Sequence, residues 1–317
     1  MKRSQFLRIA GVSLCQPALD ASAAAPEPGE KPELRIGIIA DCQYADCDNS
    51  PDGKRLYRKS IQKLEAAVGK FNDMGDLDFV VHLGDMIDRD FPSYQAVMPI
   101  YNKLKATRYQ VLGNHDFSVK DEEKARVPAA LGMQKTYYSW TKGKWRFAVL
   151  DGSDLSTYGH ASGSEKRLAA EAFLKASKKP LADYNGGLGT AQIAWLREQL
   201  TAARDAGQQV ILFCHYPIQP PSSLNLWNAA EVTDLLTSFH DVVRLWGNGH
   251  DHDGNYAAQG GIHFLNFRGM VDTENNALGV LEIYPDKIRV TGHDREPNRT
   301  LPFPAPDCPP ERIEAKK

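Results

Sequence analysis

The chain has few cysteines and no excess of charge of either sign. Its 38 Lys and Arg residues nearly balance its 40 Asp and Glu residues, which argues against a protein held on nucleic acid by charge alone. No apolar run reaches the ~18 residues that a membrane span requires. With 317 residues, the chain is long enough to bury a large core without disulfides. A disulfide framework and a zinc ribbon are both excluded, because the five cysteines are scattered and form no CxxC pair: Cys15, Cys42, Cys47, Cys214 and Cys308.

The first 25 residues have the layout of an export signal. Lys2, Arg3 and Arg8 flank a short, weakly apolar stretch, and small residues follow at 21–25. The segment is similar to a twin-arginine signal, although Ser4 stands where the second arginine is expected. We therefore predict export to the periplasm; the alternative is a cytoplasmic protein with a disordered tail. A Pro-rich linker at 26–33 and a Pro-rich tail at 301–317 would flank one catalytic domain at 34–300.

Apolar runs and amphipathic segments alternate through this domain, which predicts an α/β fold. The strand-rich end further suggests two packed sheets instead of one open sheet. Helical spacing predicts helices at 54–71, 92–105, 190–203 and 228–239, with Thr190 as an N-cap. Strands are expected at 35–40, 77–83, 109–112, 145–150, 209–213, 242–246, 263–267, 279–284 and 287–291.

Polar residues follow these strands closely. The carboxyl ends of parallel strands meet at one edge of a sheet, so these residues should converge. Asp, Asn, Gln and His together suit Mn, Fe or Zn. The blocks are Asp41-x-Gln43, Gly84-Asp85-Met86-Ile87-Asp88-Arg89, Gly113-Asn114-His115-Asp116, His215 and Gly249-His250-Asp251-His252.

In their order, the five blocks resemble the calcineurin-like metallophosphoesterases, whose motifs are DxH, GDxxDR, GNH[DE], a lone His and GHxH. The resemblance implies a sandwich of two packed β-sheets flanked by helices (αββα). Gln43 departs from the usual His, and this departure is typical of the manganese-dependent ADP-ribose/CDP-alcohol diphosphatases. Further stretches are similar to that subfamily, among them IADCQYAD (39–46), YNGGLGTAQIAWL (184–196) and GHDHDGNY (249–256).

The resemblance implies two divalent metal ions that hold an attacking hydroxide between them. Mn²⁺ is the expected metal, because the amide oxygen of Gln43 hardens the ligand set, although Fe, Zn and Mg stay open. His115 would stabilise the transition state or protonate the leaving oxygen, and Asp88 would orient the segment that carries it. One metal would take Asp41, Gln43, Asp85 and His252, and the other Asp85, Asn114, His215 and His250.

The expected substrate is a nucleoside diphosphate derivative such as ADP-ribose or CDP-choline. The alternatives are a broader phosphodiesterase or phosphomonoesterase and, with less support, a non-catalytic scaffold of the same fold. For Asp116, a structural role in helix capping or a salt link is at least as well supported as a direct role in the reaction. A disulfide between Cys42 and Cys47 is left open. Residues that could contact substrate, or could equally be structural, are Tyr44, Asn185, Gly186, Gly187 and Leu224.

Overall fold

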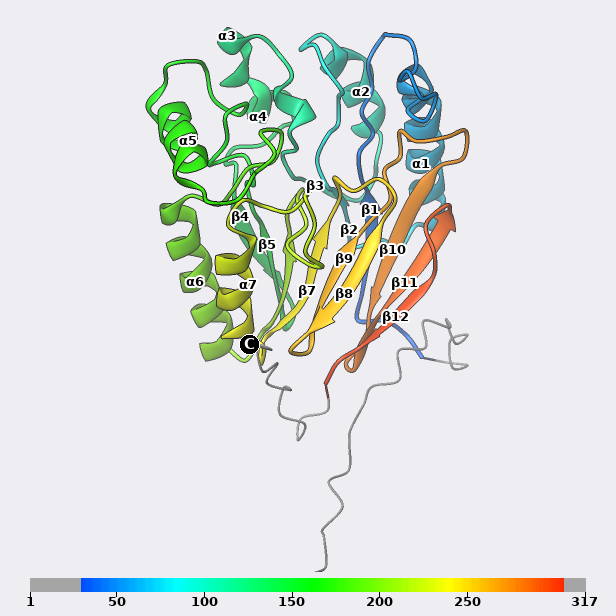
Figure 1. The fold of residues 1–317 in the computed structure, drawn as a ribbon. Helices are drawn as coiled ribbons and strands as arrows, with labels where there is room; N and C mark the ends of the chain where they lie inside the picture. The colour runs from blue at the N-terminus through cyan, green and yellow to red at the C-terminus, as the bar shows by residue number, and fades with distance from the viewer. Residues whose placement is uncertain (1–29, 305–317) are drawn as a thin grey trace, which may run out of the picture.

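The computed structural model describes residues 30–304, and within them two six-stranded sheets face each other (Figure 1). The first sheet has the order β12-β11-β10-β1-β2-β3, and the second has the order β4-β5-β6-β7-β9-β8. The strands of the first sheet are β1 (Leu34–Ile39), β2 (Phe79–His82), β3 (Thr107–Gln110), β10 (Ala277–Ile283), β11 (Lys287–Asp294) and β12 (Arg299–Pro302). Those of the second are β4 (Tyr138–Lys142), β5 (Trp145–Val149), β6 (Gln209–Phe213), β7 (Val243–Asn248), β8 (Asn255–Gln259) and β9 (Ile262–Asn266).

Helices cover the outer face of each sheet, so the predicted αββα sandwich is confirmed. Apolar residues of α1 (Ser60–Met74) and α2 (Ser93–Tyr101) pack on the first sheet. Those of α6 (Thr190–Asp205) and α7 (Ala229–Thr237) pack on the second. The remaining helices are α3 (Asp121–Lys124), α4 (Val127–Ala130), α5 (Glu165–Ala176) and the short 3-10 helices η1 (Tyr57–Lys59) and η2 (His115–Phe117).

The main core lies between the two sheets and contains the inward residues of both. Ile36 and Ile38 of β1 meet Phe147 of β5 and Phe213 of β6 there, all fully buried. Burying apolar surface on this scale is the main favourable contribution to folding. Each sheet contains a parallel set, β1-β2-β3 in one and β5-β6-β7-β9 in the other. The carboxyl ends of both sets therefore lie at one end of the sandwich, where the polar blocks follow.

The structure differs from the sequence-based expectations in several local elements. Thr190 was wrongly predicted as an N-cap, because Gly189 occupies that position and no side chain caps the helix. Strands β4, β8 and β12 and the helices α3, α4 and α5 were not predicted. β12 extends to Pro302 with Leu301 buried, two residues past the boundary predicted at 300. The export signal at 1–25 and the tail from 305 onward lie outside the described residues, as do Cys15 and Cys308. Within residues 30–304, no helix is long and apolar enough to cross a membrane.

Candidate metal centre

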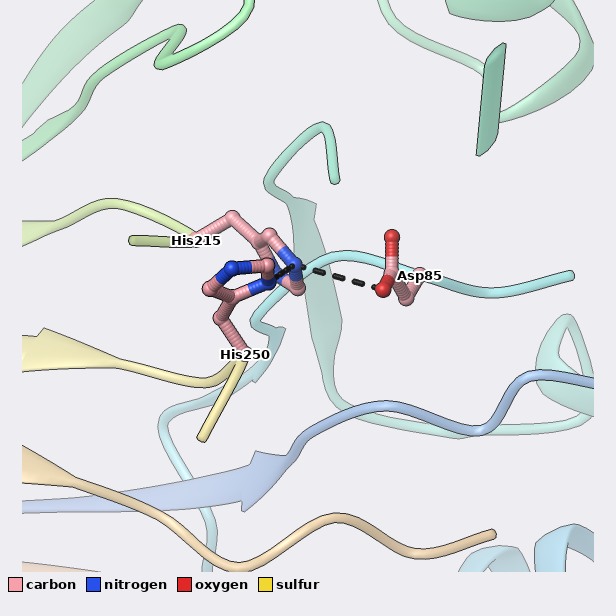
Figure 2. Close-up of side chains that lie close together, drawn as sticks. All are labelled: Asp85, His215 and His250. Carbon is pink, nitrogen blue, oxygen red and sulfur yellow. Dashed lines mark hydrogen bonds and ion pairs between the residues drawn. The ribbon is translucent and has the colours of Figure 1, made fainter. Parts of the chain in front are cut away.

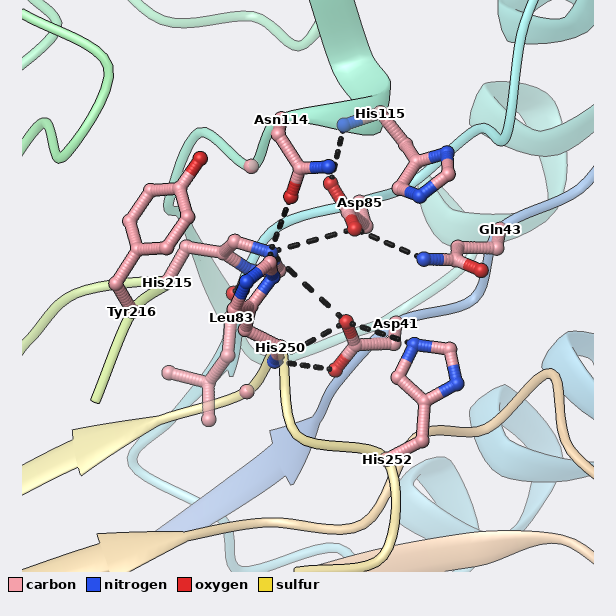
Figure 3. A network of polar contacts seen from close by, with 12 residues as sticks. Asp41, Gln43, Leu83, Asp85, Asn114, His115, His215, Tyr216, His250 and His252 are labelled. Atoms are coloured by element: carbon pink, nitrogen blue, oxygen red, sulfur yellow. Dashed lines mark hydrogen bonds and ion pairs between the residues drawn. The ribbon is translucent and has the colours of Figure 1, made fainter. Parts of the chain in front are cut away.

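The loops after β1, β2, β6 and β7 and the GNH segment at 113–115 bring the predicted ligands to one place (Figure 3). Three of these residues offer donor atoms that all lie within 4.8 Å of one another: Asp85, His215 and His250 (Figure 2). The Nε2 atom of His215 lies 3.3 Å from Asp85 Oδ2 and 3.2 Å from Asn114 Oδ1. The structure thus places the residues predicted for one metal next to each other.

The second predicted group lies directly beside the first. His252 Nε2 lies 3.5 Å from Asp41 Oδ1, and the Gln43 amide donates to Asp85 Oδ2 over 2.9 Å. Asp41 and His215 are linked across the two groups by a 4.0 Å contact. Asp85 contacts members of both groups, as a shared carboxylate should.

Backbone strain is concentrated in this centre. Asp41, Gln43, Asp85 and His250 have φ values of 52°, 43°, 56° and 73°, in the left-handed region that non-glycine residues rarely adopt. Such conformations cost on the order of 1–3 kcal/mol each and persist only where the surroundings impose them. Backbone hydrogen bonds help to hold two of them, because Asp41 N donates to the Gly84 carbonyl and Gln43 N donates to the Asp85 carbonyl.

A glycine is required where Gly249 passes Asp41. A Cβ atom at position 249 would lie 2.5 Å from Asp41 Oδ2, closer than real Cβ contacts allow. The carboxylate fills this space and accepts the His250 backbone N–H at 3.2 Å from both of its oxygens. The glycine of the last motif therefore gives room to the carboxylate of the first.

Each of the three histidines has its outer ring nitrogen bonded to an oxygen that can only accept. His215 Nδ1 donates to the Leu83 carbonyl at 2.8 Å, and His252 Nδ1 donates to Asp272 Oδ1 at 2.9 Å. His250 Nε2 donates to Asn185 Oδ1 at 2.9 Å. In the neutral ring the opposite nitrogen of each histidine therefore keeps its lone pair, and it faces the centre (Figure 3).

Two of these lone pairs face each other. His215 Nε2 and His250 Nδ1 are 3.2 Å apart, and their lone pairs repel each other unless a proton or a cation lies between them. In addition, Gln43 Oε1 is buried with no hydrogen-bond partner among residues 30–304. The Gln43 nitrogen faces Asp85 and its oxygen points away, whereas the histidine nitrogens converge beside two carboxylates and fit a divalent cation (Figure 3). The residues present are thus suited to the predicted metals.

The electrostatics also favour a cation here. Burial opposes charge on His215, yet Asp85 and Asp41 raise its pKa to about 9. Burial likewise opposes charge on Asp85, yet His215 and His115 hold its pKa well below the usual range. Burial and the neighbouring His215 lower the pKa of His250. Buried negative charge here attracts either a proton or a metal ion.

His115 lies at the edge of this centre and does not join the converging donors. Its backbone N–H donates to Asp85 Oδ1 at 2.8 Å. Its Nδ1 lies 3.1 Å from both the carbonyl and Oδ1 of Asp88, two acceptors that place a proton on Nδ1. Burial lowers the pKa of His115, but Asp85 and Asp88 outweigh it, so the net shift is upward. Asp88 thus lies where it can orient His115.

Three supporting residues have a clear place in the structure that the sequence did not show. Asp116, read as a capping or salt-link residue, accepts backbone N–H groups of Asp85, Met86 and Gly113 within 3.0 Å. Asp272, which binds His252, follows β9 outside any motif, so no sequence signal marked it. Asn185, for which a substrate contact and a structural role were both left open, accepts from His250 Nε2 through its side chain.

The other substrate-contact residues lie in differing surroundings. The Gly187 amide already donates to the Leu155 carbonyl at 2.9 Å, and a Cβ on Gly186 would lie 2.2 Å from the Gly152 carbonyl. These glycines thus permit close loop packing, and the Gly187 amide is not free for phosphate. Tyr44 is half-buried against the α1–α2 side of the first sheet. Leu224 is half-buried next to Asn225, whose carbonyl accepts from Asn185. Cys42 and Cys47 are free thiols.

Comparison with known proteins decides the family. The family model described as calcineurin-like phosphoesterase matches residues 34–254. The chain belongs to this family. The predicted metallophosphoesterase hydrolase is thereby confirmed.

Similarity to characterised relatives extends over most of the chain. It is 31% identical to the manganese-dependent ADP-ribose/CDP-alcohol diphosphatase of Xenopus tropicalis, covering 89% of this chain and 98% of the relative. The enzyme of the same name from Arabidopsis thaliana is 30% identical, with 84% and 96% covered. A solved dimetal phosphatase from Danio rerio has a TM-score of 0.77 and 26% identity, with 86% of this chain and all of that chain covered. The predicted subfamily resemblance is confirmed.

Proposed function

We propose that this family member hydrolyses nucleoside diphosphate derivatives, such as ADP-ribose and CDP-choline, at the pyrophosphate. The observation that carries hydrolysis is the set of inward lone pairs of His215, His250 and His252 beside Asp41 and Asp85. The substrate class is supported by relatives of that name which match along nearly their whole length. The side chains of Asp41, Gln43, Asp85 and His252 would hold one cation, and those of Asp85, Asn114, His215 and His250 the other.

Bound divalent cations supply charge compensation for the phosphoryl oxygens and lower the pKa of a coordinated water. The protein's own contribution is to hold its ligands in one tautomer and to keep them in strained backbone conformations. His115, at the edge of the centre, would act as the proton donor. With Nδ1 bound to Asp88, Nε2 is the nitrogen that can donate a proton to the leaving oxygen.

Manganese preference follows from Gln43. Its buried amide oxygen replaces an imidazole nitrogen, and hard oxygen ligands suit Mn²⁺ better than soft metals. The test is to strip the protein with a chelator and restore Mn²⁺, Mg²⁺, Fe²⁺ or Zn²⁺ singly. Highest turnover with Mn²⁺ is expected, and activity with Zn²⁺ but none with Mn²⁺ would contradict the proposal.

Substrate class is tested with the Mn²⁺-loaded protein. ADP-ribose, CDP-choline, cyclic nucleotides and p-nitrophenyl esters are assayed in parallel at equal concentrations. We expect the two diphosphates to have the highest kcat/KM. Dominant turnover of a simple phosphomonoester or a cyclic nucleotide would instead establish the broader esterase.

We also propose that the protein is exported and scavenges nucleotide derivatives outside the cytoplasm. Support comes from the sequence of residues 1–25 alone, with its basic start, apolar stretch and alanine-rich end. N-terminal sequencing of the protein from its natural host is the test. A start near residue 26 is expected, and an intact Met1 would favour the cytoplasmic alternative.

A further inference from the structure

Lys63 of α1 is a buried lysine whose ammonium group meets backbone carbonyls instead of a carboxylate. Its exposed fraction is only 6%. An ammonium group has three N–H donors, so the carbonyls around it satisfy it fully. Burial lowers its pKa to about 8, which leaves it mostly charged at neutral pH. Four consecutive carbonyls surround Nζ: Met270 at 2.8 Å, Val271 at 3.4 Å, Asp272 at 2.9 Å, and Thr273.

The same segment, 270–273, supports one half of the metal centre. Its Val271 N–H donates to the Asp41 carbonyl at 2.9 Å, and its Met270 N–H donates to the carbonyl just before Asp41 at 2.8 Å. Its Asp272 side chain binds His252 Nδ1 at 2.9 Å. The backbone of Asp41 and the ring of His252 are therefore both fixed by a segment that Lys63 holds in place.

Four carbonyl dipoles that point at one spot repel one another unless a cation lies between them. Lys63 supplies that cation from within the chain. The other half of the centre is held differently, since the Leu83 carbonyl fixes His215 and Asn185 fixes His250. Loss of the Lys63 charge should therefore weaken metal binding at the Asp41–His252 half and leave it unchanged at the His215–His250 half.

We propose that Lys63 is a positioning residue for the half-site formed by Asp41, Gln43 and His252. Its ammonium group binds the backbone carbonyls of 270–273. This contact holds the segment in the conformation in which the Asp272 side chain bonds to His252. This inference rests on the proposed dimetal function.

The test measures Mn²⁺ binding and not activity. Wild type and Lys63→Ala are titrated with Mn²⁺ by calorimetry, and the same samples are examined by electron paramagnetic resonance. The variant should keep one Mn²⁺ at wild-type affinity and bind the second more weakly, by up to the ~10–100-fold that is lost when a ligand's direct hydrogen-bond partner is removed. At two equivalents, the spectrum of a coupled pair should give way to that of isolated Mn²⁺.

Lys70→Ala is the matched control. Lys70 lies on the same helix and is exposed, and its side chain nitrogen lies 3.4 Å from the His293 ring, away from the 270–273 carbonyls. Removing this charge should leave both Mn²⁺ affinities unchanged. If Lys63→Ala does not fold, Lys63→Gln replaces it, because the amide keeps donors for two carbonyls without the charge.

Chemical rescue separates a cation-specific role from a packing role. Ammonium ions should occupy the space that the lysine side chain leaves in Lys63→Ala. They should restore the affinity for the second Mn²⁺ ion. Tetramethylammonium at equal ionic strength has no N–H donors and should not. Failure of ammonium to restore it would overturn the role of Lys63 as a cation.

The outcomes distinguish this inference from the proposed function. A wild-type protein that binds fewer than two Mn²⁺ refutes the dimetal function itself. If wild type binds two, and the Lys63 variants bind both at wild-type affinity or lose both equally, only the Lys63 inference fails.

Discussion

Asn185 offers the sharpest test of how the histidines are held. The sequence left open whether it contacts substrate or is structural, and in the structure its side chain is 2% exposed and accepts from His250 Nε2. The same amide donates to the carbonyls of Ser223 at 2.7 Å and Asn225 at 3.0 Å. These bonds settle which end of the amide faces His250, because only its oxygen can accept.

The perturbation is Asn185→Ala. Removal of the partner of a metal-binding histidine costs ~10–100-fold in metal affinity, or about 1.4–2.7 kcal/mol. The freed carbonyls cost about 1–3 kcal/mol each if buried, and the nearby exposed Ser223 lets water reach them, so we expect about 2 kcal/mol in total. At roughly 2 °C per kcal/mol for a domain of this size, the metal-free melting temperature should fall by ~4 °C.

The assays are Mn²⁺ titration calorimetry, thermal unfolding in chelator, and steady-state kinetics. Asn185→Asp keeps an oxygen for His250 and should retain metal affinity, while its second oxygen faces the two carbonyls and lowers stability. Asn228→Ala is the control, because Asn228 binds the same loop at both the N–H and the carbonyl of Leu188 without contacting His250. Asn228→Ala should lower the melting temperature and leave the Mn²⁺ affinity unchanged.

One result would refute the reasoning. If Asn185→Ala binds Mn²⁺ like wild type and only its KM rises, the residue contacts substrate, one of the two roles that the sequence left open, and His250 does not depend on it.

Three further predictions concern other parts of the centre and its surroundings. His115→Ala should lower kcat by ~10²–10⁴-fold with metal content near normal, measured by kinetics and elemental analysis; full activity would remove His115 from the mechanism. Gly249→Ala should abolish tight Mn²⁺ binding although every ligand is intact, because the new Cβ displaces Asp41; unchanged binding by calorimetry would show that the loop can shift. Burial, reinforced by the negative charge of Asp154, raises the pKa of Asp151 to about 7. Between about pH 4 and pH 7 the folded protein therefore binds more protons than the unfolded chain, and the free energy of unfolding falls as the pH rises. Asp151→Asn should therefore gain stability relative to wild type from pH 5 to pH 8, by at most about 3 kcal/mol, and a constant difference in urea unfolding would contradict this.

The sequence by itself determined the domain type and predicted most of the residues that meet in the candidate metal centre. Asp41, Asp85, Asn114 and His115 each follow an apolar run, and this pattern is readable because strands bury apolar residues and the chain must turn where they end. The order of the motifs then identified the family. Local patterns failed at the edge strands β4, β8 and β12, whose side chains are partly exposed and so lack a clear apolar pattern, and at the helices α3, α4 and α5.

Only the tertiary structure decided what holds the ligands in place. Asp272, Asn185 and Lys63 have no motif of their own, and their partners lie 20, 65 and more than 200 residues away in the chain. Their roles arise from hydrogen bonds between segments far apart in the chain, which meet only when the chain has folded. A side chain's type is written in the sequence, but the direction in which its donor or acceptor points depends on the backbone around it. In this structure, that direction points one ring nitrogen of each of His215, His250 and His252 toward the centre.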